Sequence, residues 1–157
     1  MGSHYETEFY NVSVTDKIQF VEAIETAISK GGWINVEPIV DDTRRSHNSG
    51  IFAWFSARGP EVPIGTFVAP VGRYPASIGV EHGAGRDAVG YLTKAGIAIP
   101  ESWILRQDHP KRGLVWEISS AELIVATSVA ELLLAMTEYF CLLPTEGQWK
   151  VAFCNPS

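Results

Sequence analysis

The stretch "EHGAGRDAVG" at residues 81–90 combines a histidine, an arginine and closely spaced glycines, which are residue types that transfer protons and bind anions. A strand followed by Gly-x-Gly and a helix is the local pattern of a phosphate-binding turn. A dinucleotide fold, however, needs a buried parallel strand before the turn, and here Glu81 and His82 occupy its end. We therefore favour an ordinary strand-to-helix turn, and keep Arg86 as a candidate ligand for a single anion.

A second group of charged side chains lies between two predicted strands. It consists of Arg106, Asp108, His109, Lys111 and Arg112, with the turn residues Pro110 and Gly113 among them. If the flanking strands pair, these side chains crowd a positively charged hairpin tip, which could dock an acidic partner or hold a phosphate. The alternative is that charges and a proline protect an exposed sheet edge from aggregation. Both interpretations stay open.

Evidence for catalysis in the sequence is weak. His82 and His109 are the candidate general bases, with Arg86 or Arg112 as the residue that would hold an anionic substrate. The sequence contains no Gly-x-Ser-x-Gly motif and no zinc or calcium ligand spacing, so we expect neither a metal nor a cofactor. This pattern favours a non-catalytic ligand- or protein-binding module. The alternative is a small enzyme that acts on an anionic substrate.

These side chains must be positioned by an alternation of strands and helices. Turn residues and apolar periodicity predict a single α+β domain over residues 5–155, with about three helices and an antiparallel-rich mixed sheet. Residues 1–4 are expected to be a tag-like or disordered start, and 41–50 a polar loop. The predicted helices are 17–30, 85–95 and 127–143, and the predicted strands are 5–14, 33–40, 51–57, 63–70, 77–82, 102–107, 113–119 and 149–154.

Composition restricts the partners of this domain. A chain of 157 residues with a net charge of −6 has no broad basic surface, so we expect no nucleic-acid partner. No apolar run reaches the roughly 18 residues of a membrane span, and we expect no membrane partner and no secretory signal. Cys141 and Cys154 form no Cys-x-x-Cys pair, which suggests a cytoplasmic protein with reduced thiols, although a disulfide between them stays open.

Aromatic and aliphatic side chains suggest the nature of a ligand. The sequence has five tryptophans, most of them expected in the core, and a subset could line an apolar pocket for an aromatic or cationic molecule. The candidate partners are therefore a small aromatic or anionic ligand or an acidic protein. The predicted core comprises Ile18, Val21, Ile24, Phe52, Trp54, Val80, Leu92, Val115, Leu132, Met136 and Phe140.

The predicted helix 127–143 is apolar around most of its circumference, with a narrow polar stripe that includes Ser128, Glu131 and Glu138. A helix of this kind is usually buried on two sides, whereas one sheet covers only one side. We therefore expect a second covering element, and a homodimer is the commonest solution.

Overall fold

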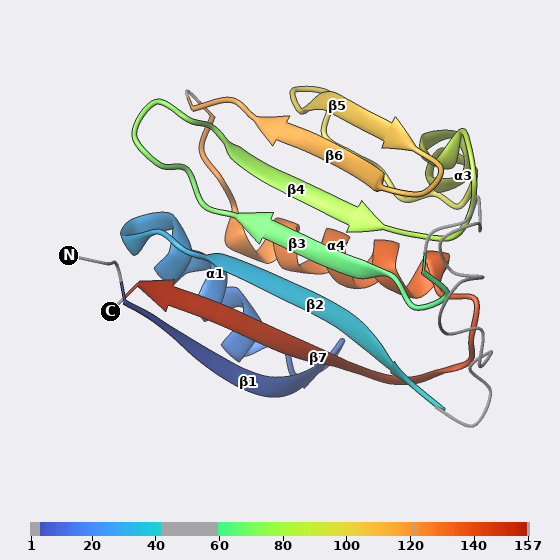
Figure 1. Ribbon diagram of the computed structural model, residues 1–157, viewed down its shortest axis with the longest axis horizontal. Helices are drawn as coiled ribbons and strands as arrows, with labels where there is room; N and C mark the ends of the chain where they lie inside the picture. Colours follow the sequence, from blue (N-terminus) through green and yellow to red (C-terminus); the bar gives the residue numbers. More distant parts are fainter. Residues whose placement is uncertain (1–3, 42–59, 121, 157) are drawn as a thin grey trace.

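The computed structural model describes residues 4–41, 60–120 and 122–156. Within these ranges the chain forms three helices and one sheet of seven strands (Figure 1). In chain order the elements are β1 (Tyr5–Ser13), α1 (Ile18–Lys30), β2 (Trp33–Val40), β3 (Ile64–Val68), β4 (Ala76–Glu81), α3 (Ala88–Lys94), β5 (Ile104–His109), β6 (Gly113–Ile118), α4 (Ala126–Phe140) and β7 (Thr145–Pro156).

The strands lie in the order β1-β7-β2-β3-β4-β6-β5, and every described pairing is antiparallel. The predicted α+β class with an antiparallel-rich sheet is therefore confirmed, and the described strands pair without any of the parallel neighbours that a mixed sheet would contain. The C-terminal strand β7 lies between β1 and β2, so the first two strands do not touch each other. In α+β folds, helices commonly gather on one face of an antiparallel sheet.

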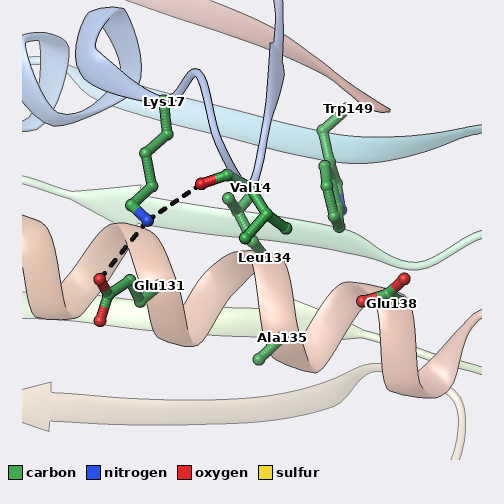
Figure 2. Close-up of a pocket in the computed structure, with 7 residues that line it drawn as sticks. All are labelled: Val14, Lys17, Glu131, Leu134, Ala135, Glu138 and Trp149. Carbon is green, nitrogen blue, oxygen red and sulfur yellow. Dashed lines mark hydrogen bonds and ion pairs between the residues drawn. The ribbon is translucent and has the colours of Figure 1, made fainter. Parts of the chain in front are cut away.

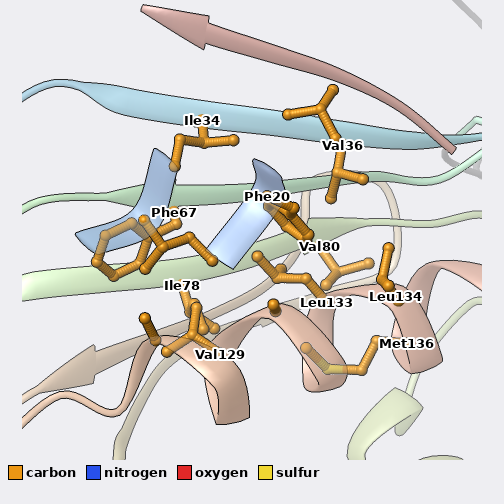
Figure 3. Close-up of a cluster of buried hydrophobic side chains, with 14 of the residues drawn as sticks. Phe20, Ile34, Val36, Phe67, Ile78, Val80, Val129, Leu133, Leu134 and Met136 are labelled. Carbon is orange, nitrogen blue, oxygen red and sulfur yellow. The ribbon is translucent and has the colours of Figure 1, made fainter. Parts of the chain in front are cut away.

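The helices α1 and α4 cover one face of the sheet, and the core lies between them and the strands (Figures 1 and 3). Successive side chains of a strand point to opposite faces of the sheet, so one face can be apolar. In β2, every second residue from Ile34 onward is buried. Figure 3 shows side chains from the sheet, such as Phe67 and Val80, meeting Leu133 and Met136 of α4. None of the described helices is both long enough and apolar enough to cross a bilayer.

The chain itself encloses most of α4. Its buried side chains contact α1 and strands β2, β3 and β4, and its exposed positions are largely the polar ones, including Glu131 and Glu138. The apolar excess of this helix therefore needs no second chain to cover it. The apolar surface of α4 therefore gives no support to the expected homodimer.

Four members of the predicted core are less buried than expected, and one of them, Val21 of α1, is half-buried at the edge of the core. Ile18 is 65% exposed because it is the first residue of α1 and precedes the buried face of that helix. Val115 is half-buried because it alternates with Leu114 and Trp116, which point to the helix-covered face. Leu132 is also half-buried on α4. The predicted strand 51–57, with Phe52 and Trp54, and all but the first residue of the 41–50 loop lie outside the described residues.

The two cysteines are half-buried and are not joined by a disulfide. Cys154 lies in β7, where its sulfur is 3.5 Å from the hydroxyl of Thr7 in the neighbouring strand. This settles the pairing that spacing alone had left open.

Candidate binding surfaces

The two charged clusters of the sequence lie at the same end of the sheet (Figure 1). Val80 in β4 is the register partner of Leu114 in β6, so the segment after β4 runs beside the β5–β6 hairpin tip. The approach is close enough that a Cβ atom on Gly113 would lie 2.1 Å from the carbonyl oxygen of Val80. The turn 82–87 and the hairpin tip are therefore neighbours.

His82 is buried, with none of its surface exposed. Its Nδ1 accepts a hydrogen bond from the Ala84 N–H at 3.1 Å, and its ring stacks on Phe140. Its Nε2 has no hydrogen-bond partner among the described residues. Burial lowers the pKa of His82 below its ordinary value, and the nearby negative charge of Asp108 partly opposes this. The ring is therefore neutral and closed to solvent in this structure.

His109 stabilises the hairpin tip. Its Nδ1 accepts hydrogen bonds from the backbone N–H groups of Lys111 and Arg112, at 3.1 and 3.0 Å. The Gln107 side chain reaches the carbonyl oxygens of Arg112 and Gly113, both at 3.2 Å. Because β5 continues through His109, the loop is shorter than the sequence predicted. The tip is therefore a turn fixed by its own side chains.

The remaining charged residues of the two clusters differ in what they contact. Arg106 forms an ion pair with Glu117 of the neighbouring strand, with 2.9 Å between Nε and Oε2. Arg86, Asp108, Lys111 and Arg112 are exposed at the end of the sheet. Arg86 thus follows β4 at the end of the sheet that carries the hairpin tip, whereas His82 is buried and stacks on Phe140.

A pocket that the sequence did not predict lies between α4 and the loop that joins β1 to α1, and we call it the α4 groove (Figure 2). Its volume is about 240 Å³, and it is lined by Val14, Lys17, Glu131, Leu134, Ala135, Glu138 and Trp149. The available signal was the spacing of Glu131 and Glu138, which places both carboxylates on one face of the helix.

Hydrogen bonds fix both ends of the α4 groove. Lys17 Nζ donates to the Val14 carbonyl oxygen at 3.2 Å and lies 3.5 Å from Glu131 Oε1. At the other end, the Trp149 indole N–H donates to Thr137 Oγ1 at 3.0 Å. The Thr137 hydroxyl in turn donates to the Leu133 carbonyl oxygen at 2.7 Å. The pocket therefore has preformed walls.

The outer edge of the sheet exposes aromatic side chains. Tyr10 of β1 donates a hydrogen bond to Gln19 of α1, so its side of the strand faces the helices and the side that carries Phe9 faces away. Phe9 is 70% exposed and Tyr5 is 51% exposed. The Tyr5 ring lies 5.1 Å from the ring of Trp33, which extends this aromatic surface toward β2.

Among the described residues, no group of three or more His, Cys, Asp or Glu side chains could hold a metal ion. No protein-family model matches the chain, and no curated protein or solved structure is significantly similar to it.

Proposed function

We propose that this chain is a non-catalytic protein-binding module that acts as a homodimer, joined through the edge strand β1. The observation that carries the proposal is the exposure of this nine-residue strand, which pairs on one side with β7 and presents Tyr5 and Phe9 to solvent. Edge strands usually carry lysine, proline or bulges that prevent pairing with another chain. β1 has neither lysine nor proline.

The sequence of β1 is compatible with pairing to its own copy. In a two-fold antiparallel pair centred on Phe9, each glutamate meets a neutral residue, so no carboxylate faces another. Phe9 would contact its own copy at the axis and add apolar surface there. The other pairs would be Tyr5 with Ser13, Glu6 with Val12, Thr7 with Asn11, and Glu8 with Tyr10.

Each protomer of such a dimer would present two exposed arginines at one end of its sheet to further partners. Arg86 and Arg112 are exposed at this end in a protein whose net charge is −6. Local positive charge favours an acidic protein or a small anion. A cytoplasmic location belongs to the same proposal, because the thiols of Cys141 and Cys154 are not joined.

The alternative of a small enzyme gains little support from the histidines. His82 has no solvent-exposed surface, and Nδ1 of His109 already accepts two backbone hydrogen bonds. A general base must reach the proton that it removes. The α4 groove contains no histidine.

Sedimentation velocity tests the dimer with two matched variants. Phe9→Asp would place two carboxylates together at the two-fold axis, so we expect a dimer for the unmodified chain and a monomer for this variant. Val71→Asp adds the same charge at an exposed residue outside β1 and should leave the dimer intact. A monomeric unmodified chain at about 100 µM, well above typical dimer dissociation constants, would refute the proposal.

A further inference from the structure

We infer that the α4 groove binds the cationic end of an arginine or lysine side chain from a basic protein partner. The inference does not rest on the dimer. Val14 and Trp149 lie on the helix-covered side, whereas Phe9 points to the opposite side of β1. The two surfaces can therefore be tested separately.

Charge at the groove selects a cation. Of its three ionisable lining residues, Lys17 pairs with Glu131, and this leaves the carboxylate of Glu138 with no ion pair among the described residues. Figure 2 shows Glu138 at the Trp149 end, away from the Lys17 amine. One negative charge is thus unbalanced in a protein that is itself acidic. An incoming ammonium or guanidinium group would pair with Glu138, and a carboxylate would be repelled.

The apolar lining suits the stem of such a side chain. Val14, Leu134 and Ala135 provide aliphatic surface beside the carboxylate, and the indole of Trp149 closes one end of the groove. Lysine and arginine characteristically lay their methylene groups on apolar surface while the charged end reaches a polar group. The groove therefore provides, within one site, apolar surface for the methylene groups and a carboxylate for the charged end.

The size of the groove favours a side chain over a free small molecule. Its volume of about 240 Å³ lies below the range of roughly 300–1,000 Å³ that is typical of small-molecule pockets. Arginine is also enriched among the few residues that dominate protein–protein binding energy. A basic protein that inserts one such residue is therefore the occupant that fits the charge, the lining and the volume.

The test uses NMR on the full chain, with the hydrogen-bonded indole N–H of Trp149 as the reporter. The probe is the peptide acetyl-Leu-Arg-Leu-amide, and its control is the same peptide with neutral citrulline in place of arginine. We expect a saturable shift of the Trp149 signal with half-saturation in the range of about 1–10 mM, as befits one anchored side chain. The citrulline peptide should bind at least about 5-fold more weakly.

Two variants locate the binding in the groove. Glu138→Gln should weaken the arginine peptide at least about 5-fold by removing the unbalanced charge, and Ala135→Leu should weaken it by filling the groove. Glu25→Gln removes an exposed carboxylate from α1 and should have no effect. Equal responses to both peptides, an unchanged affinity in Glu138→Gln, or no saturable shift at about 50 mM would each overturn the inference.

Discussion

The imidazole of His82 stacks on the ring of Phe140, with 4.5 Å between ring centroids and 23° between ring planes. This contact joins the segment after β4 to the last residue of α4. It also explains why His82, a candidate general base in the sequence, is buried in the core. A neutral imidazole suits this position, whereas a protonated one would place a charge against an apolar ring.

The burial of His82 predicts a pH-dependent stability. Its folded pKa lies below its ordinary value of 6.5, so the unfolded chain binds the proton more readily. The stability that the neutral, buried His82 gives to the folded chain is therefore fully present above pH 6.5. As the pH falls below 6.5 and through the folded pKa, the free energy of unfolding decreases by at most about 1.4 kcal/mol per pH unit. Urea unfolding from pH 7.5 to 5 should show this slope in the unmodified chain and lack it in His82→Asn. Parallel pH profiles for the two proteins would contradict the prediction.

The hydrogen bond between Trp149 and Thr137 predicts a cost for an isosteric substitution. Thr137→Val keeps the shape but removes the acceptor for the buried indole N–H, and should lower the free energy of unfolding by about 1–3 kcal/mol. Thr127→Val changes an exposed residue of the same helix and should have an effect within about 0.5 kcal/mol. Equal effects in urea denaturation would show that the buried hydrogen bond contributes no net stability.

Two glycines should respond to alanine in opposite directions. Gly113 has a φ of 86°, and a Cβ there would lie 2.1 Å from a backbone oxygen, so Gly113→Ala should destabilise the fold by more than about 2 kcal/mol. Gly90 lies within α3 with open space around its Cα, so Gly90→Ala should stabilise the fold by about 0.5–1 kcal/mol. Thermal unfolding of both variants checks the pair, and a neutral Gly113→Ala would show that the hairpin can move away from β4.

The ion pair between Arg106 and Glu117 should contribute little to stability. Both side chains are partly exposed, so a double-mutant cycle with Arg106→Gln and Glu117→Gln should give a coupling below about 1 kcal/mol that declines as salt is added. Urea denaturation at two salt concentrations measures it. A coupling that is large and independent of salt would mean that the pair is effectively buried, for example within an assembly.

Much of the fold could be predicted from local pattern. Alternation and turn residues located β2 at its observed bounds and placed β1, α1, β6 and α4 within a few residues of theirs. The strand order could not be predicted, because pairing depends on contacts between distant residues that leave no local signal. Nothing in the sequence of β7 indicates that this strand inserts between β1 and β2 rather than extending the sheet at its edge.

In the candidate sites, too, local features could be predicted from the sequence, whereas contacts between distant residues could not. Gly113 could be identified from the sequence as a turn residue, and the cluster of charged residues at 106–112 could be identified as well. The combination of a histidine, an arginine and glycines in 81–90 was also recognisable. The burial of His82 was not, because it depends on Phe140, which lies 58 positions later in the chain. The α4 groove was missed for the same reason, since Val14, Glu138 and Trp149 meet only after the sheet and helices have assembled.

The central place of β7 has a consequence for synthesis. While a ribosome makes this chain, β1 emerges first and must wait for residues 145–156 before any ladder can form on it, whereas β2 can pair with β3 and keeps its other edge open until β7 is made. To complete the sheet, β7 must pair with β1 on one side and with β2 on the other. This step joins residues at opposite ends of the sequence and is intrinsically slow. Until then the nascent chain carries exposed strand edges, which chaperones would have to shield from neighbouring polypeptides.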